Sequence, residues 1–283
     1  MEKLFRIIPK FEIKNENLVK GVRFEGLRVL GKCKDYALKY YLEGADEIIY
    51  QDIVASLYGQ NNLVNLIQQS SKDIFIPLNV SGGIRSFDDI KKILESGADK
   101  ISINSAALKN YQFLKDSCEN FGSSTISIHI EAVKNFDGNY YAFYENGRTS
   151  SNIKVVDWIK KVQEFGAGEI TLTFVDTDGT GKGLDLDFIF TLKNLIKVPF
   201  IIGGGLGSFN EILKIAKLKF VDGISISSMF HYHYLNTITL KDKNFKEGNT
   251  DFLKGFYDSK KNIEKSSIQS LKKFLKDNKI PCR

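Results

Sequence analysis

Parts of the first half of this sequence return in the second half, in the same order. The matching pairs are GADEI at 44–48 with GAGEI at 166–170, SGGIRSFDDI at 81–90 with GGGLGSFNEI at 203–212, and DKISINSA from Asp99 with DGISISSM from Asp222. The first two pairs are 122 residues apart (166 − 44 and 203 − 81), and the third pair is 123 apart (222 − 99). Repeats at one interval indicate two copies of a half-fold, here about 1–122 and 123–283. A site in one half should therefore have a counterpart in the other.

Each half alternates short apolar runs with amphipathic stretches. The strand candidates are Phe5–Ile13, Glu47–Ile53, Phe75–Val80, Lys100–Ile103, Thr125–Glu131, Glu169–Thr173, Phe200–Ile202 and Gly223–Ser227. The helix candidates lie near 34–43, 60–70, 86–96, 110–120, 153–165, 186–196, 208–217 and 266–278, with Ser86 and Ser208 as N-caps. Eight strands alternating with eight helices predict an α/β chain folded as a single-domain (β/α)8 TIM barrel with a two-fold internal repeat. An open doubly wound sheet is the alternative, but it gives no reason for the repeat.

Composition places the chain among ordinary globular proteins. With 283 residues, 42% hydrophobic and 26% charged, it can bury one large core. No apolar run approaches the roughly 20 residues of a membrane helix, and the N-terminus has no signal-peptide pattern, so we predict a cytoplasmic protein with no membrane partner. The three cysteines, Cys33, Cys118 and Cys282, are far apart and show no metal or disulfide spacing. The net charge of +6 is spread through the chain and is concentrated only near its end, which indicates a solvated helix face rather than nucleic-acid binding; an anionic substrate would also be drawn to this charge.

Small and flexible residues follow the strands at which the two halves match. They are Gly82 and Gly83, Gly204 and Gly205, Asn104 and Ser105, and Ser227 and Ser228. Glycine lets backbone amides approach an anion, and a helix that follows adds its positive end. Each half is therefore predicted to form one phosphate cradle, so that a substrate with a phosphate at each end would span the barrel mouth. The alternative is that the glycines only make tight turns.

Two carboxylates end the first and fifth strand candidates. Glu12 and Glu131 are 119 residues apart (131 − 12), and strand alternation puts both on the face opposite their isoleucine neighbours. Both should point into the barrel mouth. Carboxylates on opposite sides of one substrate can act as general acid and general base where their pKa values differ. A pair of structural acids bound by lysines is the alternative.

Several further motifs give the chain a family resemblance. They are RII at 6–8, LVKGVRFEGLR at 18–28, SGGIRS at 81–86, GADKISINSAA at 97–107, GAGEITLT at 166–173 and VDTDGTGKG at 175–183. From Arg6 to His231, and again from about Ile268 to Arg283, the chain resembles the cyclase subunit of imidazole glycerol phosphate synthase. The resemblance implies a cofactor-free cyclase that receives ammonia from a glutaminase partner in a heterodimer. It would convert a bis-phosphorylated ribulosyl intermediate to imidazole glycerol phosphate and an aminoimidazole carboxamide ribotide.

The resemblance also assigns roles to positions. The first phosphate site would comprise Gly82, Gly83, Asn104 and Ser105, and the second Asp178, Gly179, Gly204, Gly205, Ser227 and Ser228. Lys20 matches the lysine of a mobile first loop. A ring of charges that admits ammonia at the N-terminal end of the barrel would comprise Arg6, Glu47, Lys100 and Glu169. Two cations and two anions can pair around the axis, so a purely structural ring is the alternative.

The chain departs from the family at the catalytic mouth. Glu12 and Glu131 stand where the family has aspartates, and each carboxylate reaches ~1.5 Å further, where a misplacement of about 1 Å can cost on the order of 100-fold in rate. His129 should share the inward face of Glu131, where a packed core histidine is the commoner role and orienting Glu131 is the alternative. His231 and His233 have no clear third ligand, so no metal site is predicted.

Two segments flank the predicted mouth. Residues 236–265 form a polar insertion after the eighth strand that the family lacks, and 135–148 is predicted to be a hairpin beside the fifth strand. The glutamates and the insertion leave two further functions open. One is a paralogous subunit that channels ammonia to amidate (acetamidino formation) a surface-polysaccharide sugar. The other is a non-catalytic scaffold of a glutaminase.

Overall fold

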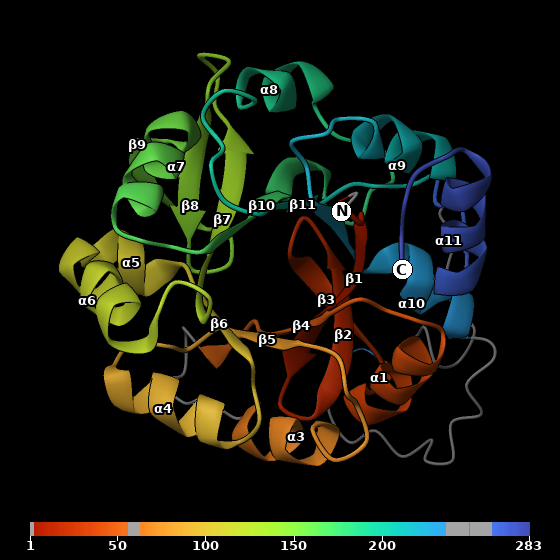
Figure 1. Ribbon diagram of the computed structural model, residues 1–283, viewed down its shortest axis with the longest axis horizontal. Helices are drawn as coiled ribbons and strands as arrows, with labels where there is room; N and C mark the ends of the chain where they lie inside the picture. The colour runs from red at the N-terminus through yellow and green to blue at the C-terminus, as the bar shows by residue number, and fades with distance from the viewer. Residues whose placement is uncertain (1–2, 56–62, 236–248, 250–261) are drawn as a thin grey trace.

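Eight parallel strands close into a barrel at the centre of the molecule (Figure 1). A computed structural model describes residues 3–55, 63–235, 249 and 262–283. In order around the barrel the strands are β1 (Arg6–Lys14), β4 (Ile48–Asp52), β5 (Leu78–Ser81), β6 (Lys100–Ile103), β7 (Ile126–Lys134), β10 (Glu169–Phe174), β11 (Phe200–Gly203) and β12 (Gly223–Ile226). The barrel closes where β12 pairs with β1, with Pro9 opposite Ile226. The predicted fold is confirmed.

Helices surround the barrel and cover the outer faces of its strands (Figure 1). They are α1 (Cys33–Leu42), α3 (Leu63–Ser70), α4 (Phe87–Glu95), α6 (Tyr111–Phe121), α7 (Val155–Glu164), α8 (Leu186–Thr191), α9 (Phe209–Ala216) and α11 (Ile268–Asp277). The helices α5 (Ser105–Lys109) and α10 (Ser228–Tyr234) and the 3-10 turn η1 (Val175–Thr177) lie directly at strand ends. The main core lies between strands and helices, whereas Ile8, Ile49 and Ile201 form a separate buried cluster. Strand alternation places that cluster inside the barrel.

The same local contacts occur in both halves. Ser86 caps α4 through a capping box with Asp89, and Ser208 caps α9 through a capping box with Glu211. A methyl group on Gly82 would lie 2.2 Å from the carbonyl oxygen of Asp52. A methyl group on Gly204 would lie 2.5 Å from the carbonyl oxygen of Phe174, and both Gly82 and Gly204 have positive φ. Each capping residue, glycine and carbonyl of the first half has its counterpart 122 residues later. This is the interval at which the first two pairs of sequence segments repeat.

Two antiparallel ribbons extend from opposite strands of the barrel. On β1 the chain continues into β2 (Asn17–Val22) and β3 (Glu25–Lys32), and on β7 it continues into β8 (Tyr140–Tyr144) and β9 (Thr149–Lys154). The predicted hairpin at 135–148 is therefore only part of a three-stranded unit. Asp137–Gly138 turns from β7 to β8, and Asn146–Gly147 turns from β8 to β9. Lys20, expected in the first loop, is a buried residue of β2, in the ribbon that connects β1 to α1.

Other predicted bounds also differ from the structure. The strand expected from Phe75 begins at Leu78, and Phe75 is 76% exposed because the chain only then enters the barrel. The helix expected at 186–196 ends at Thr191 and gives way to turns. Residues 60–62 of another predicted helix lie outside the described residues, as does most of the predicted insertion 236–265. Its described parts contact the carboxyl side of the barrel: Asn249 accepts a hydrogen bond from the Val29 amide, and the Glu264 amide donates to Gly207.

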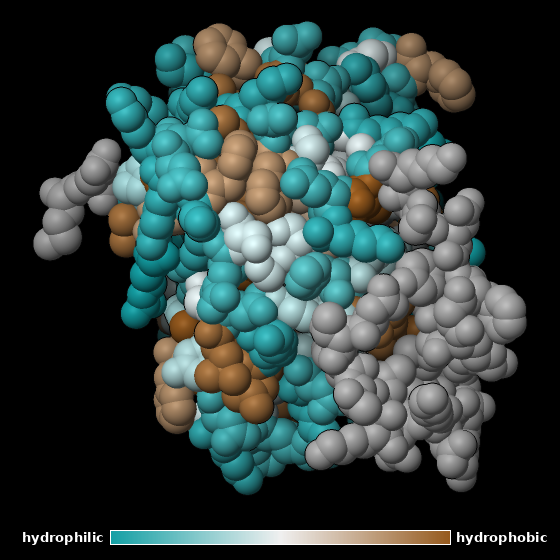
Figure 2. Space-filling model, turned by 90° about the vertical axis from the view of Figure 1, so that its right-hand side faces the viewer, coloured by the Kyte–Doolittle hydropathy of each residue, from teal (hydrophilic) through white to brown (hydrophobic). Residues whose placement is uncertain are grey.

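The face that carries α11 is largely hydrophilic, with hydrophobic side chains in separate groups (Figure 2). Within the described part of the chain no helix combines the length and apolar character needed to cross a bilayer. Cys33, Cys118 and Cys282 are all buried free thiols.

Candidate active site

Four charged side chains meet at the amino end of the barrel, each from the start of a different strand. The two cations are Arg6 and Lys100, and both of them contact both Glu47 and Glu169 at nitrogen–oxygen distances of 2.6–3.1 Å. The Asn79 amide donates a further hydrogen bond to Glu47. Burial raises the pKa of Glu47, and the neighbouring Glu169 raises it further, while both cations oppose that rise. The structure thus brings together all four residues expected for the ammonia entrance.

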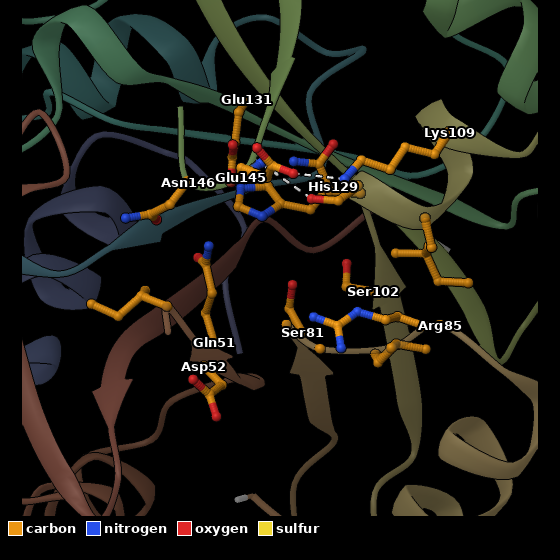
Figure 3. A pocket seen from close by; sticks show the side chains of 18 of the residues that line it. Gln51, Asp52, Ser81, Arg85, Ser102, Lys109, His129, Glu131, Glu145 and Asn146 are labelled. Atoms are coloured by element: carbon orange, nitrogen blue, oxygen red, sulfur yellow. Dashed lines mark hydrogen bonds and ion pairs between the residues drawn. The ribbon is translucent and has the colours of Figure 1, made fainter. Parts of the chain in front are cut away.

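The opposite end of the barrel holds a cavity of about 350 Å³. Its wall contains the first predicted phosphate cradle: Gly82, Gly83, Asn104 and Ser105. Glu131, His129 and Glu145 gather on one side of the space, whereas Ser81, Ser102 and Arg85 lie on another (Figure 3). The cavity therefore joins the glycine turn of the predicted cradle to a carboxylic acid.

Glu131 is 3% exposed in this cavity and its environment favours the neutral form. Burial raises the pKa of Glu131 to about 7, although the Gly147 amide and the Lys10 charge oppose the rise. The Gly147 amide donates to Glu131 Oε2 over 2.7 Å. The turn between β8 and β9 thus holds the carboxyl group in place. A carboxyl group with a pKa near neutrality can both donate and accept protons there.

Glu12 has very different neighbours. It is 1% exposed, and Lys20 Nζ donates to its Oε1 over 2.5 Å and to Asp178 Oδ1 over 2.6 Å. Burial raises the pKa of Glu12, Asp178 adds to the rise, and Lys20 and Lys10 oppose it. Burial would lower the pKa of Lys20, but its two carboxylate partners outweigh burial and raise it, so Lys20 stays charged. Glu12 points inward as expected, but Lys20 covers it and it does not reach the cavity wall.

The second predicted cradle is a much smaller hollow of about 20 Å³. Its wall contains the expected residues Asp178, Gly179, Gly204, Gly205, Ser227 and Ser228, together with Lys10. A space of that size holds roughly one water molecule. Gly179 in this wall lies directly against Gly21 of β2, since a methyl group on Gly179 would lie 2.7 Å from the Gly21 carbonyl oxygen. The structure thus brings together both sets of cradle residues, one open and one closed.

The sequence did not indicate several polar residues of the mouth as site residues, among them Gln51, Asp52 and Arg85. Gln51 and Asp52 end β4 and line the cavity, as does Arg85 in the glycine turn. The signal for Asp52 was available, since it is a carboxylate at a strand end like Glu12. Asp52 Oδ1 accepts the amide protons of Val54 and Ala55, so it shapes the turn after β4.

The histidines of the mouth serve as hydrogen-bonding groups. His129 lines the cavity beside Glu131, and its Nε2 lies 2.8 Å from Thr173 Oγ1. Burial, with the Lys10 charge, places the pKa of His129 well below its usual value, so the ring is neutral. His231 lies 2.7 Å from the Tyr40 hydroxyl, and burial lowers its pKa to about 3. No group of three or more potential metal ligands occurs in the described ranges.

Comparison with known proteins agrees with this geometry. The sequence pattern of the family described as "Histidine biosynthesis protein" matches residues 6–236. The imidazole glycerol phosphate synthase subunit HisF of Legionella pneumophila is 45% identical over 206 residues, which cover 73% of this chain and 97% of that protein. The HisF subunit of Sulfolobus acidocaldarius is 39% identical over 243 residues, 86% of this chain and 96% of that protein. The HisF subunit of Hydrogenobaculum sp. is 39% identical over 236 residues, which cover 83% of this chain and 94% of that protein. The chain belongs to the histidine biosynthesis protein family.

Proposed function

We propose that this chain is the ammonia-using cyclase subunit of an imidazole glycerol phosphate synthase. The observation that carries the proposal is the position of Glu131, which lines a cavity beside the first phosphate cradle and has a pKa of about 7. The relatives, named as HisF subunits of that synthase, support the same reaction. The substrate would be the bis-phosphorylated ribulosyl intermediate, and the products imidazole glycerol phosphate and an aminoimidazole carboxamide ribotide.

The two glutamates would divide the proton transfers. Glu12 and Glu131 come from β1 and β7, which lie on opposite sides of the eight-stranded barrel. A substrate held between them therefore meets one carboxyl group on each side. Glu131 can donate or accept a proton near neutral pH. Glu12 becomes available when substrate draws Lys20 away from it, since Lys20 covers Glu12 here.

The two cradles would hold the ends of the substrate. Positive φ at Gly82 and Gly204 turns the chain sharply after β5 and β11, so that amides of the following residues can face an anion. The capped helices α4 and α9 begin next to these turns and add their positive ends. Fixing both phosphates would orient the reacting centre between the glutamates, which is where positioning contributes most to the rate.

Ammonia would enter through the charged ring at the other end of the barrel. The four paired charges leave no net charge, so a neutral molecule can pass without an uncompensated field. The proposed partner is a glutaminase subunit that docks over this ring and releases ammonia into it. Exchanging Lys100 for methionine should lower glutamine-dependent turnover with that subunit more than turnover driven by added ammonium. Equal losses in both assays would argue against entry through the ring.

The decisive experiment supplies ammonia directly. Purified chain, high ammonium at alkaline pH and the bis-phosphorylated ribulosyl intermediate are mixed, and loss of the intermediate is followed by ultraviolet absorbance. We expect turnover that Glu12→Gln and Glu131→Gln each reduce by roughly 100- to 10,000-fold. The matched control is Glu95→Gln, which changes an exposed glutamate on α4. No turnover by the folded wild-type chain would refute the proposal and leave sugar amidation or a scaffold role. Full activity of both mouth variants would refute the assigned roles.

A further inference from the structure

Lys10 lies at the centre of the barrel, on the same inward face of β1 as Ile8 and Glu12. Neither the phosphate-site motifs nor the acid–base pair accounts for it. The residue is 2% exposed, and the described residues provide no hydrogen-bond partner for its Nζ. Its nearest described interaction is with the face of Phe24, whose ring centre lies 5.1 Å away. A buried ammonium group with three unused donors is costly, so a ligand that accepts them would be strongly favoured.

The neighbouring acids do not fill that need. Lys10 is close enough to Glu12 and Glu131 for its charge to lower the pKa of both. However, Glu12 is bonded to Lys20, and Glu131 is bonded to the Gly147 amide. The described ion pairs of the mouth do not include Lys10. Its positive charge therefore attracts both glutamates without being bound by either.

The two cradles differ in the cations that line them. The wall of the first cavity contains Arg85 and Lys109. In the wall of the second hollow, among the described residues, Lys10 is the sole cation, and the acid there, Asp178, is already paired with Lys20. A phosphate group brings nearly two negative charges and accepts several hydrogen bonds. Backbone amides and serines alone would leave most of that charge uncompensated.

We propose that Lys10 is the cationic ligand of the second cradle and binds the phosphate group that sits on Gly204, Gly205 and Ser227. This deepens the proposed function, on which it rests for the identity of the substrate but not for the binding of phosphate itself. The hollow must widen for phosphate to enter, because its present 20 Å³ suits about one water molecule. Movement of β2 away from Gly179 would provide that space. The Lys10 ammonium group would then donate hydrogen bonds to the phosphate, whereas the described residues of the present structure offer it no acceptor.

The test is a titration of the whole chain with inorganic phosphate, followed by amide NMR. The Gly83 and Gly205 resonances report the two cradles separately. A charge-assisted hydrogen bond is lost in Lys10→Met, so the phosphate affinity reported by Gly205 should fall roughly 10- to 100-fold, with Gly83 changed less than about two-fold. Lys10→Arg should restore most of the affinity. Lys14→Met is the matched control, because it removes one charge from the half-buried carboxyl end of the same strand.

Two results would overturn the assignment. One is an unchanged Gly205 affinity in folded Lys10→Met, and the other is the absence of any phosphate effect at Gly205 in the wild type. A second measurement covers a variant that does not fold: the Lys10 Cε resonance of the wild-type chain should shift on phosphate binding, and no shift would equally count against the proposal. Failure of the ammonium-driven turnover would refute the proposed reaction alone, since this titration uses no ribulosyl substrate.

Discussion

The two half-barrels present equivalent glutamates in opposite surroundings. Glu12 ends in a cluster with Lys20 and Asp178 that the β2–β3 ribbon covers, whereas Glu131 lines an open cavity and is bonded by the Gly147 amide. Both carboxyl groups are buried, and burial is the largest influence raising the pKa of each. The difference lies in the ion pair with Lys20, because the described part of the chain gives such a pair to Glu12 and not to Glu131.

A repeated scaffold can thus give two acids distinct roles without changing their residue type. The ribbon on β1 supplies a cation, while the ribbon on β7 supplies a backbone amide. Pairs of titratable groups whose surroundings differ are what acid–base catalysis requires. The comparison predicts that removing the Lys20 cation lowers the stability of the first half strongly. It also predicts that removing the Glu131 carboxyl group changes how the stability of the chain depends on pH.

The largest stability effect should come from Lys20→Met. Removing this cation leaves Glu12 and Asp178 buried without their shared partner, and breaking a buried ion pair costs roughly 3–5 kcal/mol. The loss should be measured by urea unfolding near pH 8 and should shrink near pH 5, because burial raises the pKa of Glu12 and its carboxyl group then takes up a proton more readily. Lys32→Met is the control, since its ion pair with Glu16 is exposed and should be worth less than about 1 kcal/mol. Equal losses of stability in Lys20→Met and Lys32→Met would contradict the view that Lys20 forms a stabilising buried ion pair with Glu12 and Asp178.

The second effect is a pH dependence in the other half. The pKa of Glu131 is about 7 in the folded chain against an ordinary 4.5, so the folded state binds the extra proton. The proton that Glu131 binds more tightly in the folded chain stabilises the fold at pH values below the pKa of the unfolded chain. This stability is lost as the pH rises through the pKa that Glu131 has in the folded chain. Between about pH 4.5 and about pH 8 the wild type should lose about 3 kcal/mol of unfolding free energy relative to Glu131→Gln. Glu95→Gln, at an exposed glutamate, should run parallel to the wild type. Parallel curves for Glu131→Gln as well would place the pKa near its ordinary value.

The barrel could be predicted from the sequence because the signals that specify it are local and repeated. Alternating apolar runs, the capping serines Ser86 and Ser208, and the glycine turns all act within a few residues. The same signals located the glycine turns of both cradles, since strands of one barrel end at common faces, whereas the charged ring was assigned by the family resemblance. That the four ring residues pair in a closed circuit follows once each is placed at the start of its strand.

The surroundings of the site could not be predicted in the same way. Lys20 reaches Asp178 across 158 residues of sequence, and the Gly147 amide reaches Glu131 through a second hairpin turn. Those contacts depend on how the ribbons fold over the mouth. The sequence motifs around Lys20 indicated a loop, whereas pairing with β1 and β3 makes a strand. Lys10 gave no signal because a lysine in a strand is usually an exposed residue.

The smallest difference from a matched control, about 2 kcal/mol, tests what the two halves share. Gly82→Ala and Gly204→Ala each place a methyl group within 2.2–2.5 Å of a backbone oxygen, so neither neighbour can yield easily. Gly26→Ala is the matched control, because Gly26 has a similarly positive φ of +62° with nothing within 4 Å of the added methyl group. Backbone strain alone should cost about 1 kcal/mol in the control, and the clash should add about 2 kcal/mol at the other two positions.

Thermal and urea unfolding of the three glycine variants would measure these differences. Equal losses at Gly82 and Gly204 would show that the turns after β5 and β11 are constrained alike, whatever the charges around them. The contrast between Glu12 and Glu131 would then belong to the two ribbons and not to the barrel. A loss at only one glycine would mean that the halves already differ in their strand-to-helix turns, so that the unequal surroundings of the glutamates extend into the scaffold itself.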